Sequence, residues 1–122
     1  MIRGLHHVQI AAPPGCEADA RRFYGELLGL PELAKPEPLR ARGGVWFRCG
    51  RQQLHVGVDE RFEPARKAHP ALAAWKYDEL LARLRDAGVH VEPAETIPGV
   101  RRSYVSDPWG NRLELVDVPR GA

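Results

Sequence analysis

Two stretches of the chain share one outline, and each begins and ends on a residue that can bind a metal ion. The first stretch runs from His7 to His55 and the second from His69 to Glu114, so the two spans are nearly equal. A repeated outline of this kind indicates a structural unit that is present twice. If the unit is duplicated, it brings three imidazoles and one carboxylate to matching positions, which predicts a metal-binding site.

The pattern of apolar residues predicts the same element order in both halves, a strand, a helix and then further strands. Module one is expected at about residues 4–59, a connector at 60–67 and module two at about 68–119, together forming one α+β domain over residues 1–122. The expected helices cover residues 17–28 and 79–87, the second with Asp78 as its N-cap. The expected strands cover residues 5–12, 45–49, 52–58, 68–75, 89–92, 100–106 and 112–118, with a short one at 39–41.

All four candidate ligands lie on the same side of their predicted strands. Alternate residues of a strand share a face, so each candidate points away from the aliphatic residues beside it. The aliphatic faces can then pack against the helices. The expected architecture is a curved mixed sheet that forms a cup, with helices on its outer face and the four candidates inside.

The mixture of residue types favours a borderline divalent ion. Neutral imidazoles bind zinc, nickel, iron or manganese, and one carboxylate offsets part of the ionic charge. A single histidine on a strand is usually structural or exposed, so the prediction depends on the coincidence of four. A site closed by four protein ligands could also serve stability alone.

Other polar and aromatic residues on these strands are candidates for a substrate pocket. Arg102 and Tyr104 share one strand face and could meet an anionic or oxygen-rich molecule, although an ordinary half-exposed strand explains them equally well. Gln9 shares the face of His7, and Trp46 could line the pocket, with core packing as the simpler interpretation. His6 is expected to pack on the helix side, because adjacent strand residues cannot share a face.

The composition excludes several classes of function. The formal net charge of +2 and the scattered basic residues do not predict binding to nucleic acid. No apolar run is long enough to span a bilayer, and the first residues lack the apolar core of a signal peptide, so a cytoplasmic protein is expected. Cys16 and Cys49 are expected to be free thiols in that reducing compartment.

Four motifs give the chain a resemblance to a known family. They are LHHV at residues 5–8, RFYGELLGL at 22–30, HPAL at 69–72 and DPWGNRLEL at 107–115. With these motifs the chain resembles the vicinal oxygen chelate superfamily, which includes glyoxalase I, extradiol dioxygenases, fosfomycin-resistance thiol transferases and bleomycin-binding proteins. The resemblance implies two βαβββ modules and metal ligands on the first and last strand of each, at His7, His55, His69 and Glu114.

The resemblance leaves two functions open. The first is a metal-dependent enzyme of the lyase, isomerase, dioxygenase or thiol-transferase type, in which the ion chelates two vicinal oxygens of a small substrate. Glyoxalase I-like enzymes usually have Glu where this chain has His55, and related enzymes use two His and one Glu. His55 is therefore a fourth ligand or, with Glu114, a catalytic acid or base. The second function is metal-free binding of a drug or metabolite, and a homodimer is implied for either.

Overall fold

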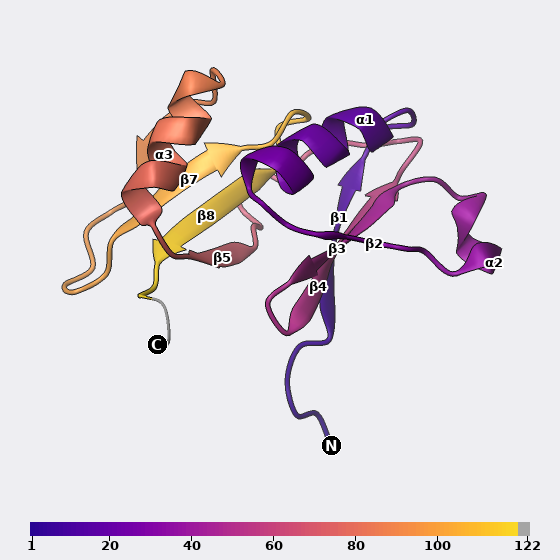
Figure 1. Cartoon of the computed structure of the whole chain (residues 1–122), viewed down its shortest axis with the longest axis horizontal. Coiled ribbons are helices and arrows are strands. Elements are labelled where there is room, and N and C mark those ends of the chain that lie inside the picture. Colours follow the sequence, from indigo (N-terminus) through magenta and orange to yellow (C-terminus); the bar gives the residue numbers. More distant parts are fainter. Residues whose placement is uncertain (120–122) are drawn as a thin grey trace. The chain divides into compact units, whose positions relative to one another are not determined.

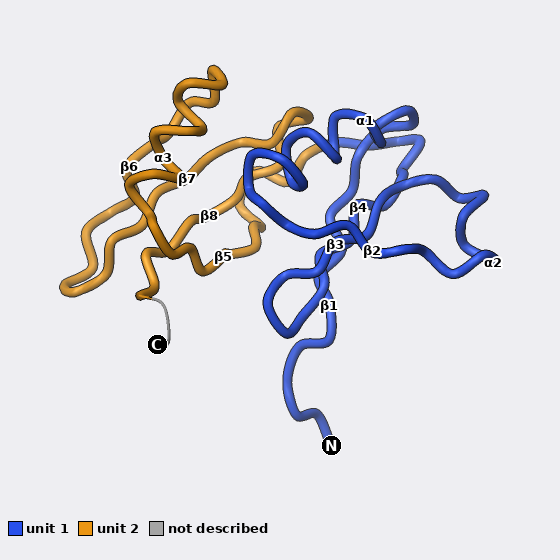
Figure 2. Tube along the Cα trace, viewed as in Figure 1, with its two compact units in different colours: residues 1–63 blue, residues 64–122 orange. Residues whose placement is uncertain are grey.

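The computed structural model describes residues 1–119 and divides the chain into two compact units. Unit 1 covers residues 1–63 and unit 2 begins at Pro64 (Figure 2). The boundary falls within the expected connector, which forms neither helix nor strand.

Unit 1 contains a four-stranded mixed sheet (Figure 1). Strand β1 is parallel to β4, β3 is antiparallel to β4, and β2 is antiparallel to β3, which gives the order β1-β4-β3-β2. The elements in chain order are β1 (His7–Ala12), α1 (Glu17–Ala20), the π-helix η1 (Arg21–Leu27), β2 (Glu32–Leu33), α2 (Glu37–Arg40), β3 (Val45–Cys49) and β4 (Gln52–Val58).

Unit 2 repeats this topology with the order β5-β8-β7-β6. Its first and last strands, β5 and β8, are again parallel neighbours, and the other pairs are antiparallel. The elements are β5 (Ala71–Ala74), α3 (Tyr77–Asp86), β6 (Val91–Pro93), β7 (Arg102–Ser106) and β8 (Arg112–Asp117). The predicted α+β class with two βαβββ modules is therefore confirmed.

The apolar face of each sheet packs against the helix of its own unit. In unit 1, the ring of Tyr24 on η1 lies 6.0 Å from that of Phe47 on β3, and both side chains are fully buried. In unit 2, Leu84 of α3 is fully buried, as are Leu113 and Leu115 of β8. Burying these faces leaves the opposite face of each sheet for the polar residues. No helix among residues 1–119 is long and apolar enough to cross a membrane.

The first predicted helix is present with a change of geometry, and one predicted strand of unit 1 is wrong in type. The helix expected at residues 17–28 changes from α to π geometry at Arg21, and the Leu28 N–H accordingly donates to the Phe23 carbonyl, five residues back. The short strand expected at 39–41 is replaced by α2. Pro36 precedes the first turn of α2 and Pro38 lies within it, where proline is tolerated because no intrahelical N–H is needed.

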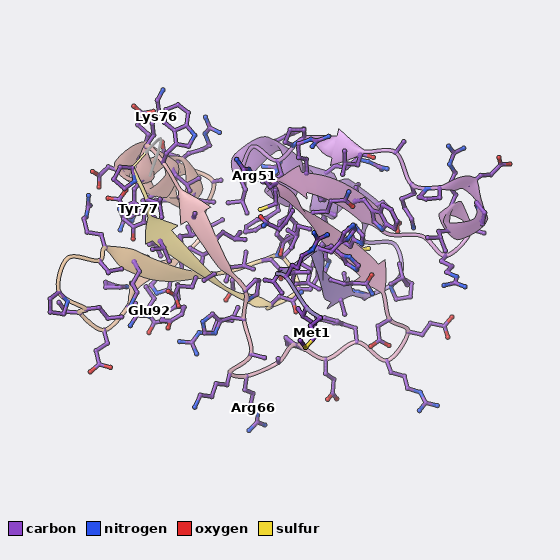
Figure 3. The ribbon with its side chains drawn as sticks, turned by 90° about the horizontal axis from the view of Figure 1, so that it is seen from below. Met1, Arg51, Arg66, Lys76, Tyr77 and Glu92 are labelled. Atoms are coloured by element: carbon purple, nitrogen blue, oxygen red, sulfur yellow. The ribbon has the colours of Figure 1, made fainter. Side chains whose placement is uncertain are left out.

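The predicted cap of the second helix is also wrong. Helix α3 begins at Tyr77, directly after Lys76 (Figure 3). Lys76 has a left-handed φ of 53°. Asp78 therefore lies inside the first turn, where a carboxylate is favourable beside the helix N-terminus. Its side chain pairs with Arg101, whose Nη2 donates to Oδ1 over 2.6 Å. Asp78 is not the cap because the helix begins one residue before it.

Candidate functional site

The polar face of unit 1 brings two of the predicted ligands into contact. His7 lies on β1 and His55 on the neighbouring β4, diagonally across the parallel pair. Their rings stack, with centroids 4.4 Å apart and planes 18° from parallel. The predicted strand phase is correct for both residues, because Ile10 and Ala12 on β1 and Leu54 and Val56 on β4, which have the opposite phase, are buried in the core.

His55 is covered by an aromatic ring. Trp46 lies opposite it on β3, and the two rings stack at 3.9 Å with planes only 3° from parallel. His55 is 4% exposed. Burial lowers the pKa of His55 from its ordinary value, and the nearby positive charges of His7, His6 and Lys35 lower it further. His55 is therefore neutral at physiological pH, the form that binds metals or accepts a proton.

The hydrogen bonds of the ring decide which nitrogen of His55 is available. Its Nε2 lies 2.8 Å from the amide oxygen Oε1 of Gln53. An amide oxygen only accepts, so Nε2 carries the proton and the lone pair is on Nδ1. The sequence pattern did not single out Gln53, although its position two residues before His55 places both on one strand face.

His6 does not pack on the helix side, contrary to the prediction. It precedes β1, so strand alternation does not govern it, and its side chain is exposed. Its Nδ1 lies 3.0 Å from Nδ1 of His7. One of these nitrogens must donate and the other accept. A proton on His7 Nδ1 would leave Nε2 as the metal-binding atom, as is usual for histidine ligands whose second nitrogen is hydrogen-bonded.

Gln9 occupies the same face, next to the histidines. It is the register partner of His55, and its side chain lies over Gly57. A Cβ at Gly57 would come within 2.7 Å of Gln9 Nε2. The Gln9 side chain can therefore occupy this position only because residue 57 is glycine. The predicted pocket residues Gln9 and Trp46 lie on either side of His55, on β1 and β3.

Unit 2 brings the other two predicted ligands into direct contact. Nε2 of His69 lies 3.1 Å from Oε1 of Glu114 on β8. The prediction that His69 lies within a strand is wrong, because β5 begins only at Ala71. The backbone nevertheless stays beside β8, since the Glu114 N–H donates to the Pro70 carbonyl over 3.0 Å. Proline restricts the residue before it to extended geometry, which holds His69 near the sheet edge.

The surroundings of His69 create an electrostatic requirement. Its Nδ1 lies 2.8 Å from the Lys67 carbonyl, which only accepts, so Nδ1 carries a proton. In the neutral ring, Nε2 then directs a lone pair at the carboxylate of Glu114. Two acceptors at 3.1 Å repel each other unless a proton or a cation lies with them. The pair therefore favours a positive charge at this point.

Arg102 and Tyr104 of β7 lie beside Glu114. The Arg102 Nη1 donates to the Tyr104 hydroxyl over 3.2 Å and lies 3.3 Å from Glu114 Oε1. Tyr104 is the register partner of Glu114. The Tyr104 ring meets the His69 ring edge to face, with centroids 5.3 Å apart. The Arg112 guanidinium lies 3.9 Å from the centre of the Tyr104 ring. Burial acts against the charge of Arg102, but Tyr104 and Glu114 raise its pKa overall. These contacts join both predicted pocket residues of unit 2 to the predicted ligands.

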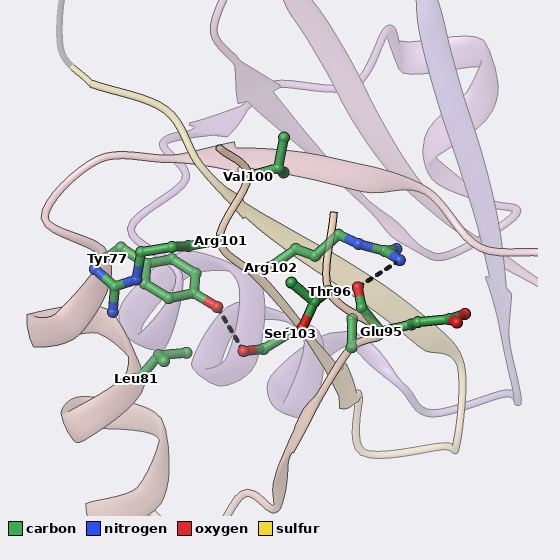
Figure 4. A pocket seen from close by; sticks show the side chains of 9 residues that line it. Tyr77, Leu81, Glu95, Thr96, Val100, Arg101, Arg102 and Ser103 are labelled. Carbon is green, nitrogen blue, oxygen red and sulfur yellow. Dashed lines mark hydrogen bonds between the residues drawn. The ribbon is translucent and has the colours of Figure 1, made fainter. Parts of the chain in front are cut away.

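A cavity of about 310 Å³ adjoins Arg102 in unit 2 (Figure 4). Its wall includes Leu81, Val100 and the hydrogen-bonded pair Tyr77 and Ser103, whose oxygens are 2.5 Å apart. The Arg102 Nη2 donates to the Glu95 carbonyl at its rim over 3.0 Å. Glu95 and Thr96 also line the cavity, so its wall combines apolar side chains with polar and charged ones.

The cysteines do not provide a nucleophile. Both are free, as predicted, and Cys16 is buried. Burial, followed by the charge of Glu17, raises the pKa of Cys16 to about 11, and burial also raises the pKa of Cys49. Both remain neutral thiols at physiological pH, and the thiolate is the reactive form.

The donor set fits a divalent metal ion in part. Two ligands in neighbouring positions at a metal with bonds of about 2.1 Å lie about 3.0–3.4 Å apart. The separation of 3.1 Å between His69 Nε2 and Glu114 Oε1 falls within that range. Within residues 1–119 no group of three His, Cys, Asp or Glu side chains is placed to hold an ion, and each unit supplies two of the four candidates.

The sequence as a whole matches one family model over residues 4–115, described as the Glyoxalase/Bleomycin resistance protein/Dioxygenase superfamily. The chain belongs to this superfamily. The match covers nearly the whole chain, in agreement with the resemblance of its motifs. A search of curated proteins gave no match.

Solved structures of the superfamily support the membership. The chain is 50% identical to a glyoxalase family protein from Bacillus anthracis, with 96% of each chain covered and a TM-score of 0.92. A lactoylglutathione lyase from Agrobacterium tumefaciens is 22% identical over 93% of this chain and 92% of its own, with a TM-score of 0.69. A fosfomycin resistance protein from Listeria monocytogenes is 18% identical over 98% and 97%, with a TM-score of 0.76. The last two show the shared fold alone.

Proposed function

We propose that the chain is a divalent-metal-dependent enzyme that acts on a small molecule with two vicinal oxygens. In this proposal the two units act as one domain, and His7, His69 and Glu114 are ligands of one ion. A fourth position is taken by His55, or His55 serves as the acid or base. Zinc, iron, manganese and nickel all suit this donor set.

The observation that carries the proposal is the pair His69 and Glu114. The Nδ1 of His69 donates to the Lys67 carbonyl, and its Nε2 lies 3.1 Å from a carboxylate oxygen of Glu114, a position that either a proton or a metal ion can fill. A histidine with its second nitrogen hydrogen-bonded to a backbone carbonyl is the usual arrangement of a metal ligand. In a purely structural pair, a second proton on the imidazole would take the place of the ion.

The residues around the ligands suggest how the chemistry would be divided. When bound, the ion would act as a Lewis acid on the oxygens of the substrate. His55 is neutral, buried and held through Nε2 by Gln53, so its Nδ1 can accept a proton. Trp46 and Gln9 flank that imidazole and would orient a substrate beside it.

A metal-free binding protein is the alternative, and one observation favours it. Arg102 already gives Glu114 an opposite charge at 3.3 Å, so the carboxylate is neutralised without an ion. The ring of Trp46 would then serve as a flat wall for a drug or metabolite. The superfamily name includes bleomycin resistance proteins, and this alternative takes them as its example.

Metal titration of the intact protein tests the proposal. We expect His69→Ala and Glu114→Ala each to weaken metal affinity about 10-fold to 100-fold or more, since each removes a bond to the ion. His90→Ala is the matched control, because His90 is exposed and lies outside both pairs. Unchanged affinity in both ligand variants, or an equal loss in His90→Ala, would contradict the assignment.

The same variants test whether two copies of the chain share a site. We propose a homodimer, and the ligand pairs of one ion could come from one chain or from two. Mixing the double variant His7→Ala, His55→Ala with the double variant His69→Ala, Glu114→Ala regenerates complete sites only if the pairs come from different copies. Restored metal uptake would demonstrate sharing, and no restoration in a mixed dimer would show that each chain supplies both pairs.

A further inference from the structure

Arg102 has more hydrogen-bonding capacity than its neighbours use. Its Nη1 donates to the Tyr104 hydroxyl and pairs with the Glu114 carboxylate, and its Nη2 donates to the Glu95 carbonyl. Its Nε is buried, and no acceptor in residues 1–119 lies within hydrogen-bond distance of it. The side chain as a whole is only 15% exposed. A buried guanidinium N–H without an acceptor is unfavourable and unusual.

The only carboxylate in contact with Arg102 among the described residues is also a predicted metal ligand. Glu114 Oε1 receives both Arg102 at 3.3 Å and His69 at 3.1 Å. A metal ion bound to this oxygen would neutralise the carboxylate, which would then no longer balance the charge of Arg102. Arg102 would then be a nearly buried cation beside another cation. A new anion at this position would restore the balance.

A second cation lies on the same face. The Arg112 guanidinium rests 3.9 Å from the centre of the Tyr104 ring, and the Tyr104 hydroxyl accepts from Arg102. On β6, Glu92 is the register partner of Tyr104, but its side chain is exposed to solvent. The carboxylate that balances Arg102 is therefore the one the metal would use.

We propose that Arg102 binds an anionic group of the substrate, and that the substrate is an anion carrying two vicinal oxygens, such as a 2-oxo or 2-hydroxy acid. This inference rests on the proposed metal-dependent function. A carboxylate or a phosphonate can accept from Nε and an Nη of one guanidinium at once, which supplies the acceptor that Nε lacks. Neutral planar molecules do not meet this requirement.

The test compares two ligands of the same skeleton that differ in charge. Oxalate is a dianion with vicinal oxygens, and oxamide is its neutral diamide. Binding of each is measured by calorimetry on manganese-loaded wild type, Arg102→Gln, Arg102→Lys and the control Arg85→Gln, which removes an exposed charge on helix α3. We expect Arg102→Gln to weaken oxalate binding at least tenfold and to leave oxamide binding within about twofold. Arg102→Lys should keep part of the preference for oxalate, and Arg85→Gln all of it.

Manganese affinity, measured first on each variant, separates this inference from the function on which it rests. Arg102→Gln should bind manganese as tightly as wild type or more tightly, because a cation beside Glu114 is gone. Lost manganese uptake in Arg102→Gln alone would show that Arg102 supports the ligands, and would overturn the inference. Intact uptake with equal losses of oxalate and oxamide would also overturn it. No manganese uptake by wild type would overturn both proposals. Glu114 would then remain the counter-charge of Arg102, and no substrate anion would be needed.

Discussion

His69 directs Nε2 at Glu114 Oε1 across 3.1 Å, while the Lys67 carbonyl holds the other ring nitrogen at 2.8 Å. The pair in unit 1 differs, since His7 and His55 stack through their ring faces at 4.4 Å. The donor atoms of the two ligands proposed in unit 2 therefore already lie close together. In unit 1 the two rings are stacked face to face. Metal binding would require a larger adjustment in unit 1 than in unit 2.

Removing the ring of Trp46 should raise the pKa of His55. Trp46 stacks on His55 at 3.9 Å, and burial is the largest cause of the lowered pKa. In Trp46→Ala water reaches the imidazole and stabilises its charged form, so the pKa should move back toward its ordinary value. Titration of the His55 ring signals by NMR measures this, with Trp75→Ala as the control, because Trp75 is half exposed. A pKa that stays the same in Trp46→Ala would show that the ring does not shield His55.

Gly44→Ala should unfold or severely destabilise the protein. Gly44 has a φ of 86°, and a Cβ there would lie 2.2 Å from the backbone oxygen of Val56. Backbone atoms within a sheet cannot move away cheaply, so we expect a loss of about 3 kcal/mol or more in the free energy of unfolding. Urea denaturation measures it.

The matched control for this substitution is Gly99→Ala. Gly99 has a similar φ of 76°, but nothing lies within 4 Å of the added Cβ. Only the backbone strain applies, and a loss of about 1 kcal/mol is expected. Equal losses in the two variants would show that the contact with Val56 contributes nothing.

Stability should fall as the pH rises from about 9 to 11. The folded protein keeps the Cys16 pKa at about 11, above its ordinary value of 9.0. Between these values the unfolded chain loses the thiol proton and the folded chain retains it. The folded state therefore binds more protons, and the free energy of unfolding decreases with rising pH. Denaturation at several pH values measures this, and Cys16→Ala should remove part of the slope. An identical slope in that variant would show that the Cys16 thiol does not cause the loss.

The repeat and the strand faces could be predicted from the sequence because both depend on local periodicity. Leu54, His55 and Val56 take the predicted sides of β4, and Leu113, Glu114 and Leu115 those of β8. The position of each in the sheet then follows from the topology shared by the two units.

Features that depend on contacts between distant residues could not be predicted in this way. The carbonyl of Lys67 orients His69, and a backbone oxygen leaves no signal in the side-chain pattern. Asp78 matches the pattern of a helix cap, but it lies inside the first turn and its carboxylate pairs with Arg101, far along the chain. The neutralisation of Glu114 by Arg102 likewise depends on the register of β7 and β8, which alternation alone does not fix.

The measurement that tests the central claim most directly is the metal content of the untagged protein, by plasma mass spectrometry after reconstitution with manganese, iron, nickel or zinc. The proposed function predicts close to one ion per complete set of His7, His69 and Glu114, and loss of that ion in Glu114→Ala. Wild-type protein that takes up none of these ions, or Glu114→Ala that retains its ion at the wild-type level, would contradict it.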